Sequence, residues 1–560
     1  MVLYYLFRLS ALALTEIFLA RLKFYPKPYP GIPFNDEAAS RITGDLPDLV
    51  PLIQASNEFS SSLLLPALRK PLITLEDPRE IEDILLRRNK DFDKASTAID
   101  VFAPMFPNAS ISQYTTPQLR AQKRLWADVM SVEFLRKAAT PNIHKATLEL
   151  LELWRLKAST IYKEQPFTTH EDFKNAALDA IWVAIVGEEP GVTRYEIKKF
   201  QHQVDGRTDK LNEPTPRGAF LKEEVAYIGE TIARNSNSPV PKWAQKLETY
   251  TSRYRKFRDD VTTQIGHAME KAVDRFQRLE MGKLEAEEFD TCMMDLVLRR
   301  QVLEAKRAGK PPTDPRKDQS MLDEMFVMLV GTPWGHDSTA NVLAWFVRFM
   351  EGYPVVQAEL RAALRTAFPD PKVPTVQDIL DTDVPYLNAV CEEGFRLAGV
   401  AKGNLRQSCV DTEILGCKIP KGAEVFMNYH INRAPVPVDE SKRTVGSQAA
   451  AEKHGDGLRR QAGQDLHTFA PWLVKDDKTG KESFNAYAIP SLAFGRGYRG
   501  CASSLLLPIL LKIHDSFRIV ATLLILHLEF SGLPEDLKPV CATEKIFRQP
   551  DMPYARVKVL

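Results

Sequence analysis

The ten residues Phe494–Ser503, FGRGYRGCAS, restrict what this chain can fold around more than any other segment. Their glycines permit a tight, left-handed backbone that can approach a flat ligand closely. Cys501 stands near the end of this loop, just before a long apolar stretch predicted as helix, where the helix dipole and the unpaired backbone N–H groups favour a thiolate. A thiolate in such a pocket suits a soft or borderline metal. The same pattern would also arise from a simple turn that packs a buried cysteine.

A second pattern interrupts a long apolar helix predicted over residues 320–351. The sequence WGHDST, residues 334–339, follows Pro333, and proline and glycine break or weaken the helical hydrogen-bond ladder. A long buried helix with a break in its middle often holds a site at the break. Asp337 and the hydroxyls beside it could relay protons there, or could form only a polar patch within the helix.

A third pattern is the pair Glu393 and Arg396 in PYLNAVCEEGFRLAG, a segment predicted as helix. Residues three apart share one face of a helix, so the carboxylate and the guanidinium can pair. The spacing alone is common and usually marks a solvated surface pair.

The loop around Cys501 resembles the haem-binding signature of the cytochrome P-450 superfamily, F-x-x-G-x-R-x-C-x-G. Phe494, Gly497, Arg499 and Cys501 match this signature, and Ser503 replaces its last glycine. The resemblance implies haem b (heme b) with the Cys501 thiolate as axial iron ligand, a ligand that favours O–O cleavage. It further implies that Arg499 pairs with a haem propionate and that Phe494 shields the sulfur.

Residues 334–339 resemble the family's oxygen-activation motif, [A/G]-G-x-[D/E]-T-[T/S], with a tryptophan at its first position. The resemblance implies that Asp337, Ser338 and Thr339 deliver protons to bound O2, while His336 faces away from the haem. Because a serine stands where the first threonine is usual, either Ser338 or Thr339 can carry the hydroxyl's role.

The helix with Glu393 and Arg396 resembles the family's K-helix, in which this pair is buried and structural. FAPWL, residues 469–473, resembles the family segment F-x-P-x-R-W but lacks its arginine. The usual Glu-Arg-Arg triad therefore needs another third member, for which Arg459 and Arg460 are candidates.

Two further arginines resemble those on the propionate side of the haem, Arg406 after the K-helix and Arg124 in LRAQKRLWADVM, where Arg120 holds the usual tryptophan position. The resemblance covers residues 26–560 and implies a mainly α fold with a small β lobe, the cytochrome P-450 fold. Residues 434–464, polar and rich in Ala, Gly and charge, are predicted to be a surface insertion.

Composition argues against a nucleic-acid-binding protein, a zinc-ribbon protein and a disulfide-stabilised protein. The formal net charge is +1 and no basic run occurs, so no nucleic-acid partner is predicted. None of the six cysteines forms a CxxC pair, which indicates a reducing compartment rather than a zinc site or a disulfide framework. Apart from Cys501, we expect the cysteines to be buried small hydrophobes.

Residues 1–24 are apolar but interrupted by Arg8 and Glu16. A charge at the bilayer centre costs about 2.5–3.5 kcal/mol, so this segment either spans a membrane imperfectly or lies on its surface. Residues 25–34, rich in proline, are predicted to be a stiff linker. The catalytic domain then extends over residues 35–560.

The sequence thus predicts a haem-thiolate monooxygenase that inserts one oxygen atom from O2 into a lipophilic small molecule, in secondary metabolism or detoxification. Electrons come from NADPH through a separate flavin-containing reductase, at the endoplasmic reticulum membrane with the catalytic domain facing the cytosol. The surrounding sequence resembles a filamentous-fungal, microsomal member. Three alternatives remain: an isomerase or dehydratase of the same fold that acts on a peroxide, a non-catalytic haem-binding protein, and a protein in which Cys501 only packs.

Overall fold

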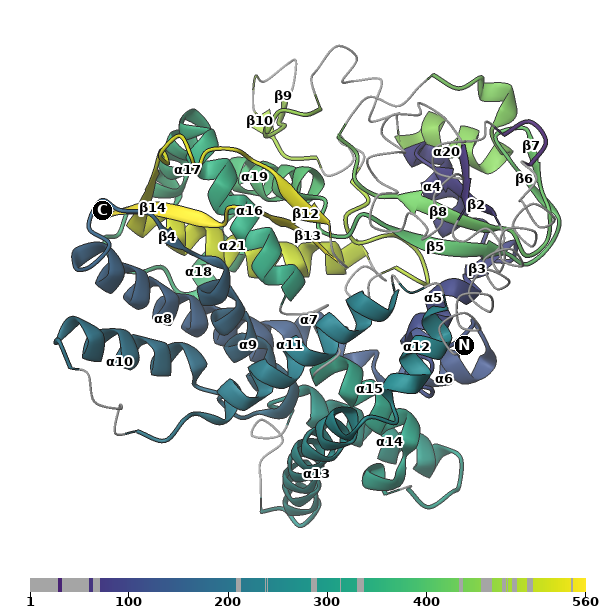
Figure 1. Ribbon diagram of the computed structural model, residues 1–560, viewed down its shortest axis with the longest axis horizontal. Helices are drawn as coiled ribbons and strands as arrows, with labels where there is room; N and C mark the ends of the chain where they lie inside the picture. Colours follow the sequence, from purple (N-terminus) through teal and green to yellow (C-terminus); the bar gives the residue numbers. More distant parts are fainter. Residues whose placement is uncertain are drawn as a thin grey trace, which may run out of the picture.

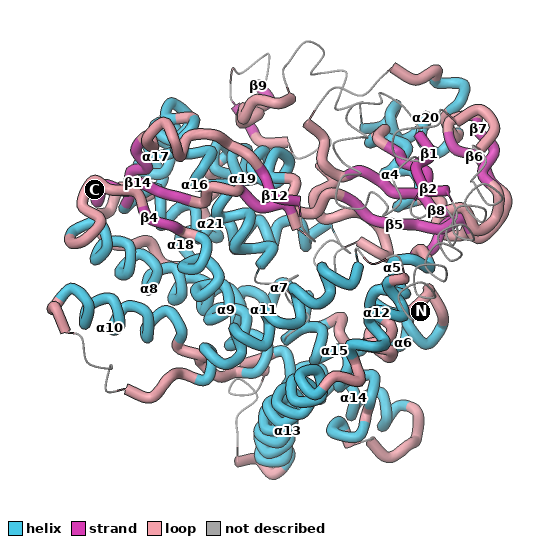
Figure 2. The backbone as a smooth tube through the Cα atoms, viewed as in Figure 1, coloured by secondary structure: helices cyan, strands magenta, loops and turns pink. Residues whose placement is uncertain are grey.

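Helices form most of the molecule, and strands gather in one lobe and along one edge (Figures 1 and 2). The structure, a computed structural model, describes residues 29–32, 60–63, 71–207, 213–236, 238, 240–283, 290–312, 314–329, 337–432, 437–454, 466–475, 480, 482–485, 491–500, 507–544 and 547–560. The predicted anchor, residues 1–24, and most of the predicted linker lie outside these residues. Within the described residues, no helix is both long and apolar enough to cross a membrane.

The helical body is built from two hydrophobic cores. One is shared by α8, α9, α16, α17, α19 and α21, and the other by α9, α11, α13, α14 and α15. The helices of this body are α8 (Thr140–Ser159), α9 (His170–Val186), α10 (Val192–Val204), α11 (Arg217–Ser236), α12 (Pro241–Glu248), α13 (Ser252–Glu280), α14 (Met293–Arg307), α15 (Gln319–Leu329), α16 (Ser338–Gly352), α17 (Pro354–Ala367), α18 (Val376–Asp381), α19 (Pro385–Ala398) and α21 (Leu507–His527).

Local sequence explains these helices. In α13 the buried residues recur every three or four positions, from Tyr254 to Ala272, which is the spacing of one helix face. Its first turn is capped by Thr251, whose hydroxyl accepts a hydrogen bond from the N–H of Tyr254 at 3.1 Å. Both the amphipathic helix and the apolar helices on either side of the predicted break are confirmed.

The β lobe is a five-stranded sheet with the order β1-β2-β8-β5-β3, which lies at the right of Figure 1. Strands β2 and β8 pair in parallel and the other neighbours are antiparallel. The sheet and the helices beside it are β1 (Ser60–Leu63), β2 (Pro71–Leu75), β3 (Phe92–Lys94), β5 (Gly403–Ser408), β8 (Glu424–Asn428), α4 (Pro78–Leu86), α5 (Ser96–Phe102), α6 (Pro117–Leu125) and α20 (Val445–His454).

Smaller sheets complete the fold. A three-stranded sheet, ordered β11-β14-β4, joins the end of the chain to the body of α8 and α16. The remaining strands are β4 (Phe167–Thr168), β6 (Thr412–Ile414), β7 (Cys417–Ile419), β9 (Val474–Lys475), β10 (Glu482–Ser483), β11 (Leu528–Ser531), β12 (Ala542–Glu544), β13 (Arg548–Pro550) and β14 (Tyr554–Val559). A mainly helical fold with a small β lobe is what the sequence predicted.

The predicted surface insertion, residues 434–464, is described in part. Residues 437–454 belong to the predicted insertion, yet Arg443 and Ser447 are buried. They lie against α4, because Arg443 pairs with Asp77 and the hydroxyl of Thr444 bonds to Asp83. The described part of this segment is therefore packed into the β lobe rather than wholly exposed.

Candidate active site

The loop 491–500 is shaped by two glycines that have a left-handed backbone and no room for a side chain. Gly497 has φ +68°, and a Cβ there would lie 2.1 Å from the carbonyl oxygen of Leu85 in α4. Gly495 has φ +65°, and a Cβ there would lie 3.3 Å from the hydroxyl of Tyr429. Only glycine permits both this φ and this closeness, so the loop is pressed between α4 and the end of β8.

The side chain of Arg499 points from this loop into the protein, where polar groups hold it. Its guanidinium donates hydrogen bonds to the hydroxyl of Thr115 and to the carbonyl of Gln113, both at 2.8 Å, and lies 3.3 Å from the carboxylate of Asp93. Burial lowers the pKa of Arg499. The backbone carbonyl of Arg499 in turn accepts a hydrogen bond from Arg406 at 3.4 Å.

Positive charge accumulates around Arg499. In the sheet, Lys94 of β3 stands directly opposite Arg406 of β5, and like charges in this position destabilise a strand pair. Burial, together with the charges of Arg499, Arg406 and Lys123, lowers the pKa of Lys94 well below its usual value. Lys123 of α6 reaches the same loop, donating a hydrogen bond to the carbonyl of Tyr498 at 2.7 Å.

An unsatisfied hydroxyl lies beside these cations. The Tyr429 side chain is buried next to Arg406, and within the described part of the chain its hydroxyl has no hydrogen-bond partner. Opposed cations and a buried, unpaired donor both call for an anionic oxygen ligand. The residues therefore fit a flat group that carries carboxylates, as haem b does with its two propionates.

Arg124, predicted to face the propionates, lies on α6 next to Lys123. Arg124 is exposed, whereas Lys123 carries the side chain that reaches the loop. Neighbouring residues of an α-helix point about 100° apart, and on this helix it is Lys123 that donates a hydrogen bond to the loop.

The pair of Glu393 and Arg396 is buried, with side chains 0% and 1% exposed. Arg396 donates to both carboxylate oxygens, at 2.7 and 2.6 Å, and to the backbone carbonyls of Ile431 and Leu466. Glu393 also accepts the backbone N–H of Ala470, at 3.1 Å. Ala470 belongs to FAPWL, so this segment contacts Glu393 through a backbone amide.

Phe494 begins the loop and packs against this helix. Its ring meets that of Phe395 edge to face, with centroids 5.1 Å apart. Phe395 also packs on Phe517 of α21, at 5.0 Å. The aromatic cluster joins the start of the loop to the two helices that flank it.

Asp337 is the N-cap residue of α16. Its carboxylate lies 3.7 Å from Lys174 of α9, which also pairs with Glu171 at 3.5 Å, and Glu171 pairs with Lys222 at 2.5 Å. These charges lead from Asp337 toward the surface, where Glu171 is 56% exposed. Beyond Asp337, Ser338 is partly buried and Thr339 is exposed.

Some predicted site residues fall outside the described part of the chain. They are Cys501 and Ser503 of the predicted haem-binding signature, Pro333, Gly335 and His336 of the predicted helix break, and the candidate arginines Arg459 and Arg460.

Sequence reasoning missed Lys94, Lys123, Tyr429 and Lys174. Lys123 had a usable signal, because it lies on the same helix as Arg124 and the apolar spacing of that helix could have fixed the inward face. Lys94 and Tyr429 are brought in by strand pairing between distant segments, which carries no local signal.

The chain resembles proteins of known families. A sequence model of the family described as "Cytochrome P450" matches residues 51–435, a span that includes the Glu393–Arg396 pair and ends before the loop 491–500. Cytochrome P450 monooxygenase TRI13 of Fusarium sporotrichioides is 29% identical over 94% of this chain and 95% of that relative. Cytochrome P450 monooxygenase GME11363 of Pestalotiopsis microspora is 28% identical over 98% of each chain. A solved structure, "Crystal structure of a Cytochrome P450 (CYP102L1)", shares the fold with a TM-score of 0.64 at 15% identity, over 96% of this chain and 100% of that chain.

Proposed function

The chain belongs to the cytochrome P450 family and is an oxidoreductase of the monooxygenase kind, and on this premise we propose that Cys501 ligates the iron of haem b. The enzyme then inserts one oxygen atom from O2 into a lipophilic small molecule, in fungal secondary metabolism or detoxification. The observation that carries the proposal is the convergence of Lys94, Arg406 and Arg499 beside the loop that leads to Cys501.

Haem with a thiolate ligand supplies O2 binding and O–O cleavage when it is bound. The protein's own part begins with orientation. The charges of Arg406, Arg499 and Lys123 gather beside the loop 491–500, where they would attract the carboxylates of haem, and the Tyr429 hydroxyl is a neutral donor beside Arg406. Charge-assisted hydrogen bonds from these groups fix a dicarboxylate in one orientation.

We assign proton delivery to Asp337 and the residues beside it. Lys174 and Asp337 stand 3.7 Å apart and connect to the exposed Glu171. In this proposal Asp337 receives a proton from that side and passes it to Ser338, the partly buried hydroxyl of the two. The exposed Thr339 has a secondary role in proton delivery.

Electrons are proposed to come from NADPH through a separate flavin-containing reductase. A decisive experiment supplies the purified protein with this reductase, NADPH, a lipophilic substrate found by a spectral binding screen, and isotopically labelled O2. One labelled oxygen atom per product molecule is expected. Turnover of a hydroperoxide without reductase or NADPH, and with none of the labelled oxygen in the product, would instead establish an isomerase or dehydratase.

We place the enzyme at the endoplasmic reticulum membrane, with the catalytic domain on the cytosolic side and residues 1–24 as an anchor. Helix α12 and its flanking residues support membrane contact, because Trp243 and Leu247 of the helix, and Val240 and Tyr250 on either side of it, are exposed. Trp243 and Leu247 are each 66% exposed, and two lysines lie nearby on the same helix, which is the pattern of an interfacial helix. Brominated lipid chains in vesicles should quench the tryptophan fluorescence of the native protein more than that of Trp243→Phe, and equal quenching would contradict this contact.

A further inference from the structure

Helix α4 forms the support on which the loop 491–500 rests. The carbonyl of Leu85, in its last turn, faces Gly497 so closely that no side chain fits between them. One turn earlier, Glu82 lies 3.8 Å from Arg496 of the same loop. Because both contacts involve the second half of α4, a shift of this helix would shift the loop that leads to the thiolate.

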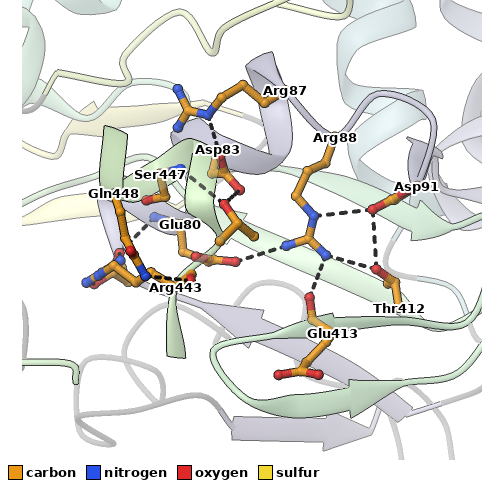
Figure 3. Close-up of polar contacts among 12 residues, drawn as sticks. Glu80, Asp83, Arg87, Arg88, Asp91, Thr412, Glu413, Arg443, Ser447 and Gln448 are labelled. Atoms are coloured by element: carbon orange, nitrogen blue, oxygen red, sulfur yellow. Dashed lines mark hydrogen bonds and ion pairs between the residues drawn. The ribbon is translucent and has the colours of Figure 1, made fainter. Parts of the chain in front are cut away.

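The N-cap residue of α4 and the middle of the helix are tied to residues 437–454 by buried polar contacts. Arg443 donates two hydrogen bonds, at 2.8 and 2.7 Å, to the two carboxylate oxygens of Asp77, and the side chains are 5% and 8% exposed. The hydroxyl of Thr444 donates to Asp83 at 2.7 Å. Figure 3 shows Arg443 in the buried polar network that surrounds Glu80 and Asp83.

Arg443 supplies the positive charge next to Asp77 in this network. Asp77 caps α4, accepting the backbone N–H of Glu80 at 2.8 Å, so its position fixes the first turn of the helix. Three buried carboxylates, those of Asp77, Glu80 and Asp83, occupy seven consecutive residues. Arg88 pairs with Glu80 at 3.0 Å, which leaves Arg443 as the cation that neutralises Asp77.

We propose that Arg443, paired with Asp77, is a positioning residue that holds α4 where the loop leading to Cys501 can rest, and so keeps the thiolate on the iron. This inference rests on the proposed ligation by Cys501. Without the guanidinium, Asp77 would be a buried, uncompensated charge beside two other acids, and α4 would move to hydrate it. The loop would follow, since Gly497 and Leu85 leave no space between them.

The test uses the full-length haem protein and compares Arg443→Leu with the native chain. The reduced protein with carbon monoxide should absorb at about 450 nm when a thiolate is the ligand, and the variant should lose more than about half of this band to shorter wavelengths. Amide hydrogen exchange should rise in residues 78–86 and 491–500 of the variant but not in α13. A global loss of stability would raise exchange in all three segments.

The matched control is Arg79→Gln. Arg79 also joins α4 to this segment with paired hydrogen bonds, at 2.7 and 3.1 Å, but its partner Glu440 is 44% exposed and can be hydrated. The carbon monoxide band of Arg79→Gln at about 450 nm and its amide hydrogen exchange should match those of the native protein. Arg443→Lys, which keeps the charge but loses the paired geometry, repeats the test if Arg443→Leu does not fold, with a smaller shift expected.

The outcomes separate the two proposals. A native protein without the 450 nm band would contradict ligation by Cys501 itself. A native protein with the band, and folded Arg443 variants with the same band and the same exchange in residues 491–500, would overturn the positioning role alone.

Discussion

The carboxylate of Glu393 accepts a hydrogen bond from the backbone N–H of Ala470, at 3.1 Å. FAPWL lacks the arginine that its family counterpart contributes to a buried triad, yet the same segment still reaches the same acid. Arg396 supplies the buried positive charge and bonds to the carbonyls of Ile431 and Leu466. FAPWL is therefore joined to the buried Glu393–Arg396 pair by a main-chain hydrogen bond, and a side-chain motif cannot reveal such a bond.

Replacing Glu393 by Gln should destabilise the protein by about 3–5 kcal/mol, because it leaves the guanidinium of Arg396 buried without its counter-charge. Glu535→Gln is a suitable control. Glu535 pairs with Lys538 at the same three-residue spacing, but its side chain is 87% exposed, so we expect a change of no more than about 0.5 kcal/mol. Denaturant unfolding measures both values, and equal effects would show that the buried pair is not structural.

Lys123→Leu should weaken haem binding more than Arg124→Leu, because Lys123 donates a hydrogen bond to the loop that holds Arg499, whereas the Arg124 side chain is exposed. A hydrogen bond to a charged group contributes about 1.5–3 kcal/mol, so the expected loss for Lys123→Leu is roughly ten- to hundred-fold in affinity. Titration with haem and with its dimethyl ester provides the second comparison. The native protein should prefer haem with free carboxylates, and Lys123→Leu should reduce that preference. A larger effect at Arg124 would reverse the assignment.

Asp337→Asn should lower turnover by about 10²-fold or more while leaving substrate binding intact, because a general acid–base group contributes on the order of 10²–10⁴. Glu171→Gln, at the exposed end of the same charge series, should have a much smaller effect. The ratio of product formed to NADPH consumed is the informative measurement, and it should fall for Asp337→Asn and for Ser338→Ala. If both variants form as much product per NADPH consumed as the native protein does, Asp337 and Ser338 have no role in proton delivery.

Glu80 should make stability depend on pH near neutrality. Burial raises the pKa of this carboxyl to about 7, although the charge of Arg88 opposes the shift and the charges of Asp83 and Asp77 add to it. The folded protein therefore holds a proton that the unfolded chain releases near pH 4.5, so this contribution to stability is complete below pH 4.5 and is lost as the pH rises through 7.

Glu80→Gln copies the protonated form and should flatten this dependence. Relative to Glu80→Gln, the free energy of unfolding of the native protein should fall by on the order of 3 kcal/mol between about pH 4.5 and pH 8. Glu230→Gln, an exposed substitution on α11, serves as the control and should leave the slope unchanged. Parallel curves for the native protein and Glu80→Gln would contradict a raised pKa.

The sequence predicted the elements that depend on local pattern. Amphipathic spacing located α13, and the glycine and arginine positions of the loop 491–500 were recognisable because they lie within ten residues of one another. The spacing of Glu393 and Arg396 predicted a pair, the resemblance to the K-helix implied that it is buried, and the structure shows both side chains buried.

What the sequence could not give depends on contacts between distant segments. Arg443 and Asp77 are separated by 366 residues, and polar composition around Arg443 indicated an exposed insertion. Burial in that segment comes from the acids of α4, not from apolar residues, so a hydrophobic pattern could not detect it. Likewise, the register of β3 against β5 places Lys94 opposite Arg406, and register is set by the assembled sheet.

The central claim is that Cys501 ligates haem iron through its thiolate, and the carbon monoxide spectrum of the reduced protein tests it most directly. We predict a band at about 450 nm for the native protein, and loss of that band in Cys501→Ser, whose hydroxyl is a harder and weaker donor to the iron. A folded, haem-loaded native protein without this band, or a Cys501→Ser variant that keeps it, would contradict the account.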